Sequence, residues 1–120
     1  MFQVSYHEIN APKSARKLPV IFVDVKNSKS VTTLFLANTG ARYEQHREEG
    51  LAHFFEHMVF KGTQKFDSSK VLAESLDSVG ADFNAFTSKE YTGYYVRSAT
   101  ANFSLALDVL SDMLFQPKLR

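Results

Sequence analysis

The segment Gly50–Thr63, GLAHFFEHMVFKGT, contains the residues of this chain that are best placed to do chemistry. Its two histidines, His53 and His57, lie one turn apart on an α-helix and about 40° from each other around the axis. Both imidazoles can therefore reach one metal ion. Glu56 is three residues after His53 and lies about 60° from it around the axis, on the side away from His57. Two nitrogen donors and a carboxylate therefore fall within an arc of roughly 100°. The spacing predicts a helix with one chemical face.

The opposite arc of the same helix is apolar, and its residues are Leu51, Phe54, Phe55, Met58 and Val59. An apolar back and a chemical front are what a buried active-site helix needs, because the back anchors the helix in the core while the front looks into a cleft. We therefore expect these apolar side chains to pack in the core.

The order His-x-x-Glu-His is the inverted form of the zinc-protease signature, with the glutamate before the second histidine. Average residue usage makes this pattern rare by chance in a short chain. The whole segment Gly50–Thr63 closely resembles the active-site helix of the pitrilysin/insulinase family of metallopeptidases. The preceding passage Gly40-Ala-Arg-Tyr-Glu44 is similar to a G-A/S-R-x-E passage of the same family, so the resemblance extends backward.

A second stretch, residues 79–95, resembles the family's G-x-x-x-N-A-x-T-x-x-E-x-T-x-Y segment. The resemblance implies that the strand with Asn84 and Ala85 borders the cleft and that an extended substrate pairs with it. Taken alone, this stretch better fits an ordinary aromatic hairpin. Beside the first motif, the functional interpretation is favoured, with Asn84 and Ala85 as substrate-binding residues.

The resemblance implies a zinc-dependent endopeptidase in which His53 and His57 are metal ligands and Glu56 is the catalytic general base. At such sites, two imidazoles and the carboxylate of a further residue hold Zn²⁺ and leave a fourth position for water. The pKa of this water falls to about 7. Glu56 would accept a proton from that water as it attacks a peptide carbonyl, and would later deliver the proton to the leaving amine.

The family's third zinc ligand is a glutamate about 75 residues after the second histidine, which would fall near position 130, beyond Arg120. Glu74 and Glu90 are alternatives within the chain, but neither has this spacing. His7, in a predicted strand, and His46, in a charged loop, are interpreted as structural or exposed residues rather than ligands. The sequence therefore carries a metal-binding motif without a completed site.

Composition limits the other function classes. At 120 residues and 44% hydrophobic, the chain can form one small domain, residues 1–120. A net charge of +1 without a basic block gives no reason to expect nucleic acid or an anionic membrane as partner. There is no cysteine, and no signal peptide or long apolar run is visible. We expect a soluble, cytoplasmic location.

Periodicity and turn residues predict an α+β fold in the order β-β-β-α-α-β-β-α, a mainly antiparallel sheet with helices packed on one side. Polar residues 48 and 49 are expected near the N-terminus of the active helix, and Gly62 is expected to end it. Two later helices should bury apolar stripes. The expected strands are 2–9, 20–25, 31–37, 81–87 and 91–97, and the expected stripes are Leu72, Leu76 and Val79, then Phe103, Leu107, Leu110 and Leu114.

Members of the family are far longer than this chain, and their related αβ units enclose the substrate. The resemblance therefore implies that the chain is the N-terminal part of the first unit of a pitrilysin-type αβ roll, which is incomplete here. The implied partners are a peptide or unfolded polypeptide substrate and a second homologous half or subunit, with a homo-oligomer as another possibility. Two alternative functions remain open: a non-catalytic partner subunit of a peptidase assembly, and a zinc-binding fragment without activity.

Overall fold

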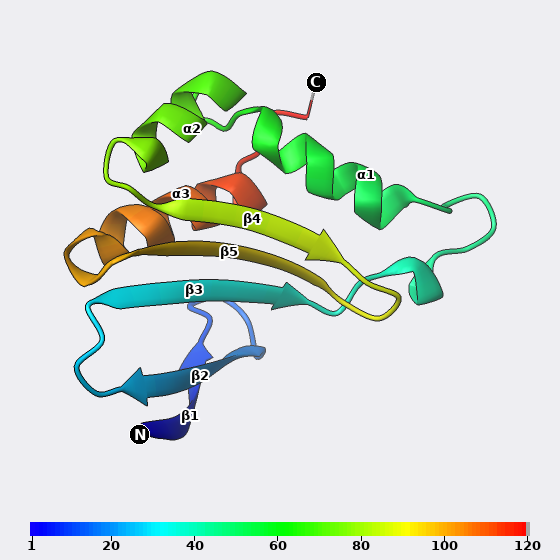
Figure 1. Ribbon diagram of the computed structural model, residues 1–120. Coiled ribbons are helices and arrows are strands. Elements are labelled where there is room, and N and C mark those ends of the chain that lie inside the picture. The colour runs from blue at the N-terminus through cyan, green and yellow to red at the C-terminus, as the bar shows by residue number, and fades with distance from the viewer. Residues whose placement is uncertain (120) are drawn as a thin grey trace.

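The computed structural model describes residues 1–119 and has the element order expected from the sequence, so the α+β prediction is confirmed (Figure 1). The strands and helices are β1 (Phe2–Asn10), β2 (Lys17–Val25), β3 (Ser30–Ala37), α1 (Leu51–Met58), α2 (Ser69–Asp77), β4 (Asp82–Thr87), β5 (Thr92–Ala99) and α3 (Phe103–Phe115). No helix in the described part is long and apolar enough to span a membrane.

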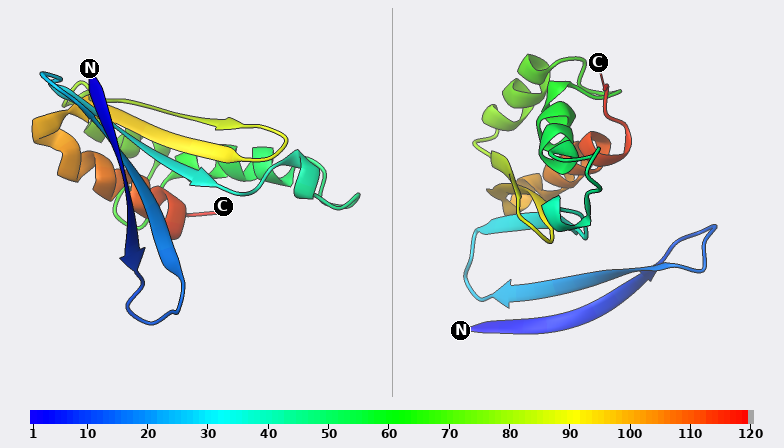
Figure 2. Two further views of the ribbon diagram at one scale, coloured as in Figure 1. Left: turned by 90° about the horizontal axis from the view of Figure 1, so that it is seen from below. Right: turned by 90° about the vertical axis from the view of Figure 1, so that its right-hand side faces the viewer.

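A three-stranded antiparallel sheet in the order β3-β5-β4 forms the centre of the molecule. In β3 and β4, alternate residues face the helices and are half-buried, whereas most residues of the central strand β5 are buried. The left view of Figure 2 shows the helices gathered on this one side of the sheet. The central strand β5 contributes most to the core, with Tyr94 and Val96 only 3% and 1% exposed.

The strands β1 and β2 form a separate antiparallel hairpin, so the five strands make two sheets rather than one. The hairpin extends beyond β3, away from the helices (Figures 1 and 2). Most of its side chains are exposed on both faces, because nothing in residues 1–119 covers it.

The helix α2 has a clear cap at its start and a glycine after its end. The Ser68 hydroxyl accepts a hydrogen bond from the Val71 amide, which satisfies one of the free N–H groups of the first turn. Leu72 and Leu76 are buried at 1% and 0% exposure. Gly80 follows with a φ of 67°, a left-handed conformation that a residue with a side chain rarely adopts.

The faces that α1 and α3 bury agree only in part with those expected. Val59, directly after α1, is buried and Phe55 packs against the core as expected, whereas Leu51 and Phe54 are 55% and 59% exposed. In α3, the second half of the predicted stripe is confirmed, because Leu110 is buried and Leu114 packs against the core, but the first half is wrong. The buried face of each helix also includes an alanine, Ala52 in α1 and Ala106 in α3, which residue hydropathy alone does not single out. The buried residues of α3 include Ala106, Val109, Leu110 and Met113, whereas Phe103 and Leu107 are 38% and 46% exposed.

The chain leaves α1 through a short 3₁₀ turn, Val59–Lys61, and then Gly62, which ends the helical segment as predicted. The loop that follows is held against α3. The Lys65 amide donates to the buried Asp112 carboxylate at 3.1 Å, and the Lys65 ammonium lies 2.5 Å from Asp108. The C-terminal end of α1 is therefore fixed to α3 as well as to the sheet.

Candidate active site

The two histidines of α1 meet on its exposed side. The Nε2 atoms of His53 and His57 are 3.0 Å apart, and their ring centroids are 4.6 Å apart. Two nitrogen ligands about 2.0–2.1 Å from a tetrahedral zinc ion would be separated by about 3.3 Å, so a small opening of this pair would admit the metal. Neutral imidazole is also the commonest nitrogen donor for zinc in proteins. The donor set therefore fits the ion.

Glu56 lies between the histidine face and the sheet and is half-buried. Its Oε2 accepts a hydrogen bond from the hydroxyl of Thr87, the last residue of β4. The neighbouring side chain of Tyr94 is buried, and burial raises the pKa of its phenol to about 12, with the nearby Glu56 carboxylate adding to the rise. The three side chains of the motif thus divide into two exposed imidazoles and one carboxylate held from the side of the sheet.

The N-terminus of α1 is capped by Glu44, a residue that lies well before the helix. Its two carboxylate oxygens accept hydrogen bonds from the amides of Gly50 and Ala52, at 2.7 and 2.8 Å. Residues 48 and 49 lie directly before the N-cap Gly50, as expected, but their carboxylates bond to other groups. Glu48 accepts from the amide of Gln45, and Glu49 pairs with His46 instead. A carboxylate that satisfies two free N–H groups and opposes the positive end of the helix stabilises the first turn.

The passage Gly40–Glu44 connects this cap to the β4–β5 hairpin. The amides of Ala41 and Arg42 donate to the carbonyls of Ser88 and Lys89, at 3.4 and 2.7 Å. A Cβ at Gly40 would lie 2.5 Å from the Ser88 carbonyl oxygen, so only glycine permits this approach. The Arg42 guanidinium forms an ion pair with Glu90. The two family-like passages of the sequence are therefore in direct contact.

No further metal ligand joins the histidine pair among residues 1–119, where no group of three or more His, Cys, Asp or Glu side chains could hold an ion. Glu90 is engaged with Arg42, and Glu74 lies on α2 beside Lys70 at 3.9 Å. Neither alternative contacts the histidines. His7 lies on the exposed hairpin, where its Nε2 is 3.2 Å from the Ser5 hydroxyl.

Asn84 and Ala85 lie on β4, which is an edge strand of the three-stranded sheet. The Asn84 side chain is exposed, and its amide oxygen accepts from the Ala85 N–H at 2.8 Å. Because N–H groups of an edge strand point alternately toward and away from the neighbouring strand, this bond identifies the Ala85 N–H as one of the outward-facing donors. The strand thus has a backbone donor on its free edge.

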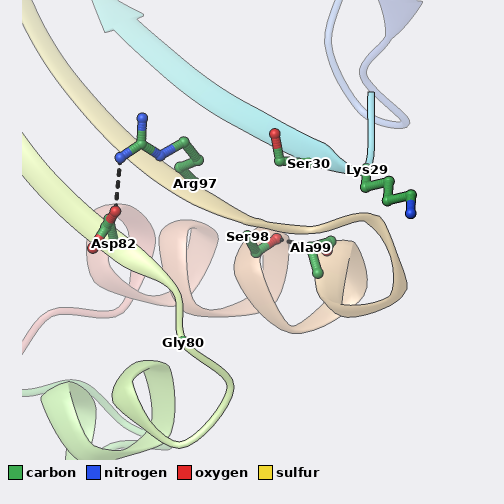
Figure 3. Close-up of a pocket in the computed structure, with 7 residues that line it drawn as sticks. All are labelled: Lys29, Ser30, Gly80, Asp82, Arg97, Ser98 and Ala99. Atoms are coloured by element: carbon green, nitrogen blue, oxygen red, sulfur yellow. Dashed lines mark hydrogen bonds and ion pairs between the residues drawn. The ribbon is translucent and has the colours of Figure 1, made fainter. Parts of the chain in front are cut away.

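Two of the hollows on the surface of residues 1–119 are lined without either histidine of α1. The larger, about 440 Å³, is at the end of the sheet where β3 and β4 begin, and Figure 3 shows the Arg97–Asp82 ion pair, 2.8 Å long, across it. It contains no histidine and is at the opposite end of β4 from Thr87. The second, about 320 Å³, lies beneath the start of α1. Its lining includes Glu44, Ala52, Phe55, Thr92 and Tyr94.

Two residues of the site were not identified from sequence, namely Glu44 as the cap and Thr87 as the partner of Glu56. Both lie inside the family-like passages, so the resemblance was a signal for their importance. Their partners could not be deduced, because Glu44 acts on amides six and eight positions later and Thr87 lies 31 positions after Glu56. Such pairings depend on how α1 is placed on the sheet.

The chain is similar in sequence to several known proteins. The chain is 41% identical over 105 residues to an uncharacterized zinc protease from Rickettsia bellii, covering 88% of this chain and 25% of that protein. It is 47% identical over 87 residues to the uncharacterized zinc protease YmxG from Bacillus subtilis, covering 72% and 21%. The beta subunit of the mitochondrial-processing peptidase from Dictyostelium discoideum is 40% identical over 81 residues, covering 68% and 17%. The chain thus spans a quarter or less of the length of these relatives.

The fold is similar to that in the crystal structure of a protease from Helicobacter pylori, with a TM-score of 0.84 and 23% sequence identity, covering 98% of this chain and 27% of that chain. At this level of identity the likeness concerns the fold alone. The sequence match to a family extends over residues 20–120 and takes in the whole of α1 and the β4–β5 hairpin. The resemblance seen in the sequence is therefore confirmed, and the chain belongs to the insulinase family, peptidase family M16.

Proposed function

We propose that this chain is the N-terminal part of a pitrilysin-type peptidase domain and that it carries the catalytic helix of a zinc-dependent endopeptidase. The observation that carries the proposal is the meeting of the His53 and His57 Nε2 atoms, 3.0 Å apart, beside a half-buried Glu56. Family membership and relatives named zinc proteases support the same activity.

In this proposal, His53 and His57 hold zinc through their Nε2 atoms, and the family's downstream glutamate, or one from a partner, completes the ligand set. When bound, zinc supplies a Lewis acid and lowers the pKa of a water molecule on it to about 7. Glu56 accepts the proton of the attacking water at its carboxylate and then delivers it to the nitrogen of the departing amine. Glu44 keeps the first turn of α1 in place, so that the histidines keep their spacing.

The proposed substrate is an extended peptide that pairs with the free edge of β4. The outward Ala85 N–H supports this, because an edge strand offers backbone hydrogen bonds with little dependence on side chains. The side-chain amide oxygen of Asn84, which accepts from the Ala85 N–H, would release this donor and bond to the substrate instead. A second homologous half or subunit would close the cleft, and one relative is named as a subunit of a processing peptidase.

The test compares three variants of the full-length protein that carries this chain. Glu56→Gln should abolish cleavage of a fluorescence-quenched peptide while zinc stays bound, because the amide cannot accept the proton and the proposed ligands remain. His53→Ala and His57→Ala should lose both zinc and cleavage. Zinc content is measured by atomic absorption on the same preparations.

Two results would contradict the proposal. Loss of zinc in Glu56→Gln would assign this carboxylate to coordination. Zinc retained by the unaltered protein without any peptide cleavage would favour a zinc-binding module or a non-catalytic subunit instead.

A further inference from the structure

The hydrogen bond between Thr87 and Glu56 joins the histidine motif on α1 to β4, two parts of the site that lie far apart in the sequence. Thr87 ends β4, the strand that carries Asn84 and Ala85, and its hydroxyl donates to Oε2 of Glu56 on α1. Thr87 is itself half-buried, so its hydroxyl is partly shielded from solvent. Among residues 1–119, this side-chain hydrogen bond links α1 directly to β4.

The surroundings fix the position of the Thr87 hydroxyl. Thr87 pairs in register with Thr92 of β5, and the buried Thr92 hydroxyl donates to the Thr39 carbonyl at 2.9 Å. The threonine hydroxyl has one proton to donate, and in this structure it goes to Glu56. The sheet therefore presents a donor at a defined place beneath the half-buried carboxylate.

We infer that Thr87 is a positioning residue for the general base. A carboxylate has two oxygens, and holding Oε2 from the side of the sheet stops the group from rotating freely while leaving Oε1 available to take a proton. The buried phenol of Tyr94 stays neutral and adds no competing negative charge near this carboxylate. The inference rests on the proposed function, since it needs Glu56 to be the base.

One consequence is that the strand proposed to take the substrate also sets the direction of the base. A small displacement of β4 would move Thr87 and with it the carboxylate. Misplacement of a catalytic group by about 1 Å can cost on the order of 100-fold in rate. Thr87 should therefore act on kcat rather than on metal binding.

The test measures kcat, KM and zinc content of the full-length protein with substitutions at Thr87. Thr87→Val keeps the shape and removes the donor, so kcat should fall about 10- to 100-fold with KM and zinc unchanged. Thr87→Ser keeps the hydroxyl and should recover most of the rate. The matched control is Thr33→Val on β3, where the hydroxyl has no partner within residues 1–119 and its removal should leave kcat unchanged.

A double-mutant cycle separates positioning from folding. Glu56→Asp withdraws the carboxylate from Thr87, so adding Thr87→Val to Glu56→Asp should cause no further loss of kcat. The inference would be overturned if Thr87→Val had the same kcat as the unaltered protein, or if Thr87→Val and Thr87→Ser lost kcat equally. The proposed function would still stand in either case, provided that Glu56→Gln is inactive. Full activity of Glu56→Gln would overturn both.

Discussion

At the scale of single residues, the site combines groups that solvent reaches with groups that the sheet holds. His53 and His57 are exposed, whereas Glu56 is half-buried and Tyr94 is 3% exposed. This division suits a metal-dependent hydrolase, because ligands must be open to the ion and the substrate while the base benefits from a fixed direction.

Tyr94 gives a prediction about stability at high pH. Burial raises its pKa from 10.0 to about 12, so the folded state binds the phenolic proton more tightly than the unfolded state does. The stabilisation is complete below pH 10 and is lost as the pH rises toward 12. Tyr94→Phe cannot ionise, so its free energy of unfolding should fall less steeply across this window in urea titrations at several pH values.

The control for this prediction is Tyr43→Phe, because Tyr43 is 56% exposed and has no comparable burial. It should keep the steep alkaline loss of the unaltered chain. A Tyr94→Phe variant with the same pH dependence as that chain would show that Tyr94 does not ionise differently on folding.

The residues of the motif could be predicted from sequence because helical spacing alone brings His53, Glu56 and His57 to one arc. The partners of Glu56 could not. Thr87 is one of many polar residues, and only the placement of β4 beside α1 selects it. The roles of these residues in catalysis stay predictions until the variants above are measured.

At the scale of secondary structure, α1 is short and depends on contacts outside itself. Its eight residues are fewer than an isolated helix needs to persist in water. Its N-cap residue, Gly50, provides no side-chain acceptor, and Glu44 takes that role from the preceding loop. The start of the helix is thus set by the connection to the β4–β5 hairpin.

Glu44→Ala should therefore loosen α1. We expect a loss of about 1–2 kcal/mol in the free energy of unfolding, which is the range for a lost helix cap. Chemical denaturation checks this, and hydrogen exchange of the Ala52 amide should become faster. Glu48→Ala serves as the control, because Glu48 accepts from Gln45 and not from the helix; an equal loss there would indicate a general charge effect instead.

The free edge of β4 gives a second prediction at this scale. Ala85→Pro removes the outward N–H without removing a bond to β5, so the fold should remain while peptide KM rises several-fold and zinc is retained. Peptide kinetics on the full-length protein measure the change. The matched variant Ala85→Gly keeps the N–H and should not raise KM. Unchanged kinetics in Ala85→Pro would exclude this edge from the binding site.

The elements themselves were largely predictable, since alternation, β-branched runs and turn residues identify each strand and helix within a few positions. The buried faces of α1 and α3 were predictable only in part. Both helices carry apolar residues over more than one face, and the choice between faces depends on how each helix is placed on the sheet. A rule based on hydropathy favours the larger side chains, so it assigned to the core some side chains that are exposed in the structure, such as Leu51 and Phe54.

At the scale of the whole molecule, the β1–β2 hairpin sets the shape. The radius of gyration is 15.5 Å, against about 14 Å for a compact domain of this length. Alternation predicted the two strands, but no signal in the sequence indicated that they stand apart from the main sheet. Large apolar side chains on both faces of the hairpin are between 55% and 77% exposed, namely Phe2, Tyr6, Ile9, Ile21, Phe22 and Val23.

We expect the isolated 120-residue chain to self-associate through the exposed apolar side chains of this hairpin. We also expect it to hold zinc loosely and to cleave no peptide, because its histidine pair has no third ligand in the described part. Sedimentation velocity should show oligomers for the unaltered chain and monomers for the double substitution Ile21→Thr with Phe22→Thr. Leu107→Thr, at a 46% exposed position of α3, is the control and should still associate.

Chelator-sensitive cleavage by the isolated chain, lost in Glu56→Gln, would contradict this prediction. It would indicate that a second copy of the chain, or one of Glu74 and Glu90 after a rearrangement, completes the metal site.

The dependence of α1 on distant contacts also determines when the site can form during synthesis. Glu44 is synthesised before the helix that it caps. Thr87, however, follows Glu56 by 31 residues, and the Ser88 and Lys89 carbonyls that hold the capping passage are synthesised later still. A chain released only as far as α1 holds both histidines on a segment too short to stay helical. The histidine pair can reach the described geometry only after the β4–β5 hairpin has left the ribosome and docked, so the site forms well after its own helix has been synthesised.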